Sequence, residues 1–90
     1  MPSMEDLAKK QIERPVIKLI SEMIGAADHS MIDSTIPLKR LGIDSLGMIN
    51  LLLGIEKEFS LTVPEEDFTP ENFGTAASII EYLSKRILLR

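Results

Sequence analysis

Apolar residues recur at helical spacing in three stretches of this chain, whereas the apolar and polar alternation of a half-buried strand is poor throughout. Proline and glycine punctuate these stretches, and both residues end helices or open turns. A chain of 90 residues has room for one small domain. The pattern therefore predicts an all-α fold, a four-helix bundle with three longer helices, a short third helix and a long loop between the first two.

The first long helix is expected over residues 13–24, with Gly25 as a natural C-cap. Residues 1–11 are interpreted as an N-terminal extension, frayed or helical, with Ser3 as its N-cap. Pro15 is expected to interrupt a helix that arrives from this extension, because proline lacks a backbone N–H and clashes with the preceding turn. The apolar face of the first helix follows helical spacing: Ile12, Val16, Leu19, Ile20 and Met23.

The long connection spans residues 26–43, because no helix continues through Pro37. Its apolar residues are expected to pin it to the core: Ile32, Ile36, Leu38 and Leu41. A second long helix is expected from Ser45 to Phe59, after two good N-cap residues, Asp44 and Ser45 itself. The core stripe of this helix is Met48, Leu51, Leu52, Ile55 and Phe59.

This second helix carries a further apolar stripe on nearly the opposite face, formed by Leu46, Ile49 and Leu53. Such a stripe is either buried on both sides or left exposed for a partner, and we favour the partner. A third face has only small, uncharged residues, which indicates either close approach of another group or tolerated drift: Gly47, Asn50 and Gly54.

The remaining chain predicts a short helix and then a third long one. Residues 65–67 suit a short helical turn after Pro64. Thr69 is a favoured N-cap and Pro70 a favoured first residue, so a short helix is expected to begin there. The last helix opens at Gly74-Thr75. Its apolar face comprises Ala76, Ile79, Ile80, Leu83 and Ile87, and its C-terminal end carries Lys85, Arg86 and Arg90.

Composition excludes several kinds of chemistry. The chain has no Cys, so it has no disulfide, no thiolate nucleophile and no Cys-ligated metal. His29 is the single His and is expected in a solvated loop, so no His cluster binds a metal. The chain is too small to enclose a substrate, which argues against an enzyme. It has neither a signal peptide nor the roughly 20 apolar residues of a membrane span, so a cytoplasmic protein is expected.

Charge is unevenly distributed along the chain. Residues 1–43 hold six acids and six bases, whereas residues 44–81 hold eight acids and one base, a net charge of −7. An acidic segment repels phosphate, so nucleic acid is not an expected partner. It suits a basic protein partner, or it is simply a solvated surface. A monomer is the default expectation.

Ser45 places a hydroxyl at the start of a helix, after a long loop and ahead of an apolar patch. Helix N-termini stabilise anions, so a phosphoester on Ser45 would be well accommodated. No His or Lys is recognisably positioned to activate it, which argues against a hydrolase. Taken alone, Asp-Ser before a helix is a common cap.

The chain resembles the acyl and peptidyl carrier proteins over residues 12–87, which are taken as the carrier domain, with 88–90 as a C-terminal tail. The resemblance rests on Leu41-Gly42-Ile43-Asp44-Ser45-Leu46, Glu56-Lys57-Glu58-Phe59, Val63-Pro64 and Thr75-Ala76. It implies that a separate phosphopantetheinyl transferase, using magnesium, attaches 4′-phosphopantetheine from coenzyme A to Ser45. The thiol of that arm would hold acyl or aminoacyl groups as thioesters, received from a loading enzyme and presented to downstream synthase or transferase enzymes.

The resemblance also implies roles for neighbouring residues. Leu46, Ile49 and Leu53 match an exposed recognition patch, Glu56 matches an acid that meets basic partner residues, and Asp44 would orient the transferase or the cofactor. Typical fatty-acid carriers have acids at three positions that differ here: Gly47, Asn50 and Lys57.

These departures suggest a dedicated partner set, in a polyketide, nonribosomal peptide or other specialised pathway. The short flanks suggest a stand-alone carrier, and Gly-Ile-Asp-Ser-Leu leans slightly towards acyl cargo. The alternatives are an aminoacyl or peptidyl carrier, or an unmodified helical interaction module that would tolerate Ser45→Ala.

Overall fold

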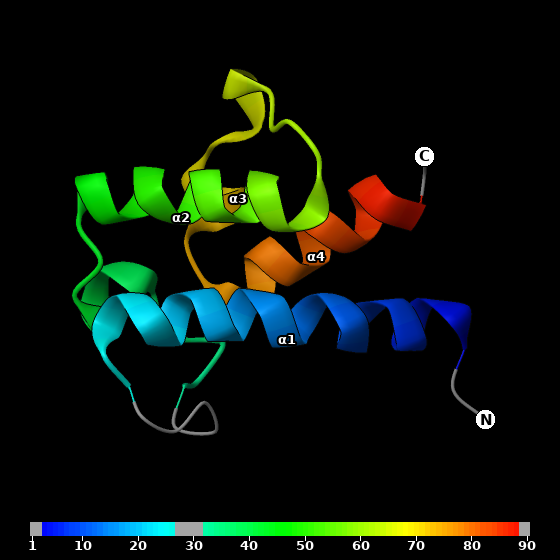
Figure 1. Ribbon diagram of the computed structural model, residues 1–90, viewed down its shortest axis with the longest axis horizontal. Coiled ribbons are helices and arrows are strands. Elements are labelled where there is room, and N and C mark those ends of the chain that lie inside the picture. The colour runs from blue at the N-terminus through cyan, green and yellow to red at the C-terminus, as the bar shows by residue number, and fades with distance from the viewer. Residues whose placement is uncertain (1–2, 27–31, 89–90) are drawn as a thin grey trace.

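The computed structural model describes residues 3–26 and 32–88, and no strand forms among them (Figure 1). The helical elements in chain order are α1 (Met4–Ile24), η2 (Leu38–Leu41), α2 (Ser45–Phe59), η3 (Glu65–Asp67), α3 (Pro70–Phe73) and α4 (Ala76–Leu88). The predicted bundle is thereby confirmed, with α1, α2 and α4 as its longer helices and α3 as its short one. The 3-10 turn η2 was not expected within the long loop, whereas η3 lies where a short helical turn was predicted.

The α1 helix is continuous from Met4 to Ile24, so the expected break at Pro15 is wrong. Proline costs the helix one hydrogen bond at its interior. Ile12 and Val16 lie on either side of Pro15 and are both buried, so their burial holds the two halves of the helix in one line.

The expected extension is the first part of this same helix. Ser3 and Asp6 form a reciprocal capping box, as the sequence suggested for Ser3. The Nζ atom of Lys9 lies 3.0 Å from a carboxylate oxygen of Glu81 on α4. The hydrogen bond and the positive charge of Lys9 lower the pKa of the Glu81 carboxyl. Residues 4–11 are therefore helical and are tied to α4.

The three long helices pack with α1 along one edge and α2 along the other, and α4 lies behind them (Figure 1). The shared core is aliphatic apart from one aromatic ring, and its members are Ile12, Val16, Ile20, Leu38, Ile43, Leu51, Ile55, Val63, Phe73, Ala76, Ile79 and Leu83. The predicted core stripe of α2 is confirmed, fully buried at Leu51 and Ile55 and half-buried at its other members.

The second half of the long loop is pinned to the bundle. Two residues named in the sequence analysis, His29 and Arg90, lie outside the described residues. Leu38 is buried, and its backbone N–H donates to the Gly74 carbonyl at 2.9 Å. The N–H of Ala77 donates to the Ser34 carbonyl at 2.9 Å. These bonds hold η2 against the junction of α3 and α4.

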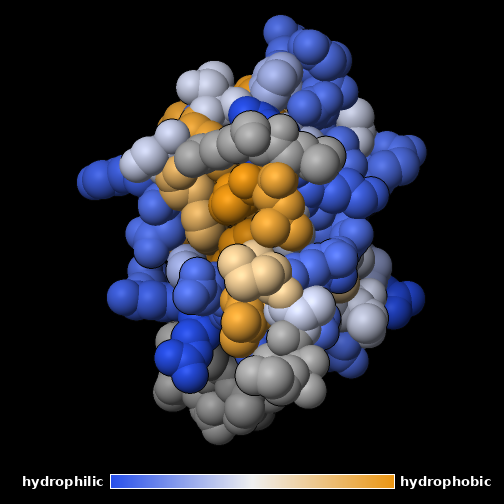
Figure 2. All heavy atoms as spheres, turned by 90° about the vertical axis from the view of Figure 1, so that its right-hand side faces the viewer, coloured by the Kyte–Doolittle hydropathy of each residue, from blue (hydrophilic) through white to orange (hydrophobic). Residues whose placement is uncertain are grey.

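The end of the bundle where α1 begins and α4 ends shows hydrophobic atoms gathered among hydrophilic ones (Figure 2). Met4, Leu7 and Leu88, which belong to these helix ends, are exposed. Ser45 begins α2 at the opposite end (Figure 1). Within residues 3–26 and 32–88, no helix combines the length and the apolar character that crossing a bilayer requires.

Because Pro15 lies inside a continuous helix, Pro15→Ala should restore the missing hydrogen bond and raise the free energy of unfolding by about 1–3 kcal/mol. Urea unfolding followed by circular dichroism measures this change. Arg14→Ala, at the exposed neighbouring position, should stay within about 0.5 kcal/mol of the unchanged protein. A Pro15→Ala protein that is no more stable than the unchanged protein would contradict this account of α1.

Candidate functional site

The start of α2 is set by Asp44, which is its N-cap. The Asp44 carboxylate accepts a hydrogen bond from the backbone N–H of Gly47 at 2.8 Å. Ser45 is therefore the first residue of the helix and not its cap, which settles an alternative that the sequence left open. Its side chain is exposed and has no capping role.

The chain enters α2 through a tight turn after η2. Gly42 has φ of +94°, a left-handed conformation that side chains rarely adopt, and its N–H bonds the carbonyls of Leu38 and Lys39. Ile43 follows and is buried, and its N–H donates to the Leu38 carbonyl at 3.2 Å. The backbone is thus anchored two residues before Ser45.

Gly47 allows a close packing of α1 and the loop against the first turn of α2. A Cβ at this position would lie 3.0 Å from Cγ2 of Ile43 and 3.3 Å from the methyl carbon of Met23. At Gly54, about two turns further along α2, a Cβ would lie 3.2 Å from Leu19 of α1. The third face of α2 is therefore a close approach to α1 at its two glycines, whereas Asn50 is exposed.

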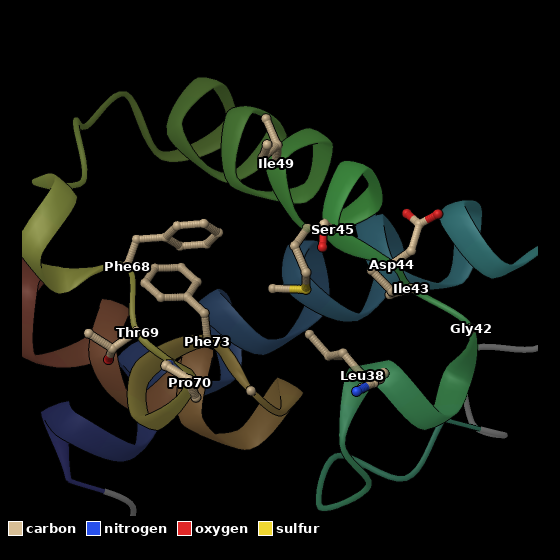
Figure 3. A pocket seen from close by; sticks show the side chains of 13 residues that line it. Leu38, Gly42, Ile43, Asp44, Ser45, Ile49, Phe68, Thr69, Pro70 and Phe73 are labelled. Carbon is tan, nitrogen blue, oxygen red and sulfur yellow. The ribbon is translucent and has the colours of Figure 1, made fainter.

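A cleft with a volume of about 690 Å³ opens beside Ser45. In Figure 3, the Ser45 hydroxyl is directed from α2 into this cleft, with η2 on one side and α3 on the other. Phe68 and Phe73 stack edge to face at 5.3 Å and form much of the α3 wall. The other apolar side chains of the lining are Leu38, Ile43, Met48, Ile49 and Pro70.

Several cleft residues were not predicted as site residues. Lys39, Phe68 and Phe73 are far from Ser45 in sequence or in a different element, and only the packing of the loop on α3 brings them together. The apolar type of the two phenylalanines indicated a core position as readily as a cleft position. No sequence signal separates these two environments.

The second apolar stripe of α2 is exposed, as predicted: Leu46, Ile49 and Leu53 are 66%, 48% and 56% accessible. Three large apolar side chains on one side of a single helix form a surface that monomeric proteins usually cover. We call these three residues the α2 patch.

Glu56 is half-buried and its carboxylate accepts a hydrogen bond from the backbone N–H of Val63 at 2.7 Å. This bond fastens the chain that leaves α2. The acid that the resemblance assigned to partner contacts therefore also holds this loop.

The same loop is fastened at its other end by a small network. The Tyr82 hydroxyl donates to the Asp67 carboxylate at 2.8 Å, and Arg86 donates to the Tyr82 oxygen at 2.8 Å and to the Thr62 carbonyl at 2.9 Å. Burial and the hydrogen bond to Asp67 raise the pKa of Tyr82. The side of the cleft formed by Phe68 and α3 is therefore attached to α4 by hydrogen bonds.

Within the part of the chain that the structure describes, no group of acidic or histidine side chains is arranged to hold a metal ion. The site consists of one exposed hydroxyl, an anchored helix start, an apolar cleft and an apolar patch. A site of this form can hold a group that is attached covalently to the hydroxyl.

Comparison with known proteins agrees with this form. Residues 14–83 match the family model described as phosphopantetheine attachment site. Aminoacyl carrier protein 1 of Bradyrhizobium diazoefficiens is 31% identical over 71 residues, which cover 76% of this chain and 77% of that protein. The chain therefore belongs to the acyl and peptidyl carrier proteins, the family whose members carry 4′-phosphopantetheine covalently.

Two solved structures share the fold. The crystal structure of Bradyrhizobium japonicum glycine:[carrier protein] ligase complexed with glycylated carrier protein contains a chain that matches with a TM-score of 0.69 and 28% identity, over 78% of this chain and 95% of that one. The crystal structure of the same ligase complexed with cognate carrier protein and an analogue of glycyl adenylate also contains a matching chain. Its TM-score is 0.69 at 26% identity, over 88% of this chain and 97% of that one. Carrier proteins are generally not catalysts themselves.

The residues at the start of α2 fit the prosthetic group. An exposed hydroxyl on the first residue leaves room for a phosphodiester, and the free N–H groups of a 15-residue helix stabilise its negative charge. Once bound, the group supplies a flexible arm that ends in the thiol this chain lacks.

Since Asp44 and not Ser45 caps α2, the two substitutions should differ. Asp44→Ala should lower the free energy of unfolding by about 0.5–2 kcal/mol through loss of the Gly47 N–H partner. Ser45→Ala should leave it within about 0.5 kcal/mol, as expected for a surface position. Chemical denaturation of both variants checks the order, and equal losses would show that the cap is shared.

Proposed function

We propose that Ser45 is the residue to which 4′-phosphopantetheine is attached. The observation that carries this proposal is the position of its hydroxyl, which is exposed at the first residue of α2 and directed into the cleft. Asp44 and Ile43 support the role, because the first caps the helix and the second anchors the chain immediately before it.

The proposed transfer is a displacement at phosphorus. The Ser45 oxygen forms a bond to the phosphorus of the phosphopantetheine moiety of coenzyme A, the bond from that phosphorus to the adenine nucleotide breaks, and 3′,5′-ADP leaves. The hydroxyl proton goes to a base of the phosphopantetheinyl transferase. The chain itself contributes the anchored oxygen and the helix N-terminus.

The cargo that the comparisons favour is an aminoacyl group, held as a thioester on the arm. Its proposed loading enzyme is an adenylating ligase, as in the complexes of the similar carriers. Downstream synthase or transferase enzymes would then receive the cargo through the α2 patch. In this proposal the chain is not an enzyme. Its carrier domain spans residues 12–87, with residues 4–11 as a helical extension. The protein works in the cytoplasm, where coenzyme A supplies the arm.

An acyl cargo is the second candidate, because the cleft beside Ser45 is wide and apolar. Its lining includes Met48, Ile49, Phe68 and Phe73, which would shield a hydrocarbon chain from water. A glycyl group has almost no apolar surface to bury there. The two cargoes therefore differ in what the cleft can do for them.

The attachment site is tested by intact mass. After incubation with coenzyme A and a promiscuous phosphopantetheinyl transferase, the unchanged protein should gain one phosphopantetheine group, and Ser45→Ala should gain none. Circular dichroism of Ser45→Ala should match that of the unchanged protein, which excludes misfolding as the reason. An unchanged protein that stays unmodified would leave only the helical interaction module.

The cargo is tested by comparing arms. The same transferase can install a glycyl or an octanoyl pantetheine arm from the corresponding coenzyme A thioesters. The octanoyl arm should shift the NMR resonances of Phe68 and Phe73 relative to the bare arm, whereas the glycyl arm should not. An octanoyl arm that leaves both rings unshifted would remove the support for an acyl cargo.

A further inference from the structure

Two acidic side chains, Asp44 at the start of α2 and Glu56 near its end, each hold a backbone N–H. Asp44 accepts the Gly47 N–H at 2.8 Å, and Glu56 accepts the Val63 N–H at 2.7 Å. Glu58 lies 13 residues after Ser45 on the same helix, about 20 Å along its axis. Residues 45–55 of α2 carry no charged side chain, so the exposed Asp44 is the acid nearest to Ser45 in the sequence.

Two basic side chains also stand beside the site. Lys39 and Arg40 lie on η2 and are both exposed, and Lys39 lines the same cleft as Ser45. None of the ion pairs formed among the described residues includes either side chain. Figure 3 shows Leu38 of η2 across the cleft from Pro70 of α3, so Lys39, the next residue of η2, belongs to the η2 side of the cleft.

The acids of the following segment border the other side. Glu65 and Glu66 are exposed on η3, which leads into Phe68 and Pro70 of the α3 wall. Apart from Asp44 at the start of α2, the surface around Ser45 thus runs from basic at η2, through the apolar α2 patch and cleft, to acidic at η3. A partner that matches it must carry the reverse order of charge, which fixes the direction from which it docks.

We propose that the α2 patch and the adjoining η2 turn receive a partner protein whose docking face is apolar and is edged with carboxylates where it meets Lys39 and Arg40. The proposal deepens the proposed function and rests on it, because enzymes that act on Ser45 must approach over this surface. It departs from the sequence-based expectation that acids of α2 meet a basic partner. The basic side chains select by charge, while Leu46, Ile49 and Leu53 supply the buried area.

Two synthetic amphipathic helical peptides test the docking chemistry with the full-length chain. They share one leucine face, and one carries Glu and the other Lys on its flanks. In ¹⁵N–¹H NMR titrations, the Glu peptide should shift the amides of Arg40, Leu46 and Ile49 and bind about threefold to tenfold more tightly than the Lys peptide. The preference should shrink as ionic strength rises from about 0.05 to about 0.3 M.

Matched double variants locate the effect. Lys39→Glu with Arg40→Glu should abolish or reverse the preference for the Glu peptide. Lys10→Glu with Arg14→Glu makes the same change of charge at two exposed positions of α1 that do not line the cleft, and should keep the preference. A preference lost equally in both variants, an initial preference for the Lys peptide, or no binding of either peptide would overturn the proposal.

The titration is independent of the modification of Ser45. If the mass experiment succeeds and the peptides fail, the docking chemistry is wrong and the carrier function stands. If Ser45 cannot be modified, the proposed function fails whatever the peptides do.

Discussion

The hydrogen bond from the Gly47 N–H to the Asp44 carboxylate is the interaction on which the site depends. It starts α2 at Ser45, and so it decides that this hydroxyl stands at the positive end of a helix dipole instead of being used as a cap. If Ser45 were the cap instead, its hydroxyl would accept a backbone N–H of the first turn and would not be free. The buried Ile43 and the left-handed Gly42 keep the cap in place.

A carrier needs this firm base because everything beyond it is flexible. A tethered cargo reaches each partner at a high effective concentration, so the protein surface itself needs only modest affinity and the complex can part quickly. A patch of three exposed side chains is consistent with that demand, since stable complexes bury larger surfaces. The close packing of α1 on the two glycines of α2 keeps the patch in one orientation relative to Ser45.

The helices could be predicted from the sequence because they depend on local signals. The bounds of α2 follow from Asp44 and from the apolar spacing up to Phe59, and α3 follows from Thr69 and Pro70. Pro15 was misjudged because the burial of Ile12 and Val16, which depends on the whole bundle, outweighs a local rule. The 3-10 turn η2 lacked any periodic signal at all.

The site could be predicted only in part, for the same reason. The exposed α2 patch follows from a stripe that the core cannot cover. The cleft does not follow from the sequence, because it requires η2 to lie beside α3, where the Leu38 N–H bonds the Gly74 carbonyl. The engagement of Glu56 with Val63 was also invisible, since residue type alone does not tell a free carboxylate from one that holds a loop.

The packing around Gly47 has a consequence for remodelling this carrier. An acidic side chain at this position, as in typical fatty-acid carriers, would begin with a Cβ only 3.0 Å from Ile43 and 3.3 Å from the Met23 methyl. The two neighbours would have to shrink or move before the acid could be accepted. Grafting such an acid onto α2 therefore depends on whether Ile43 and Met23 can give way by a few tenths of an ångström. It also depends on the cap, because the same Cβ would lie 3.3 Å from Oδ1 of Asp44.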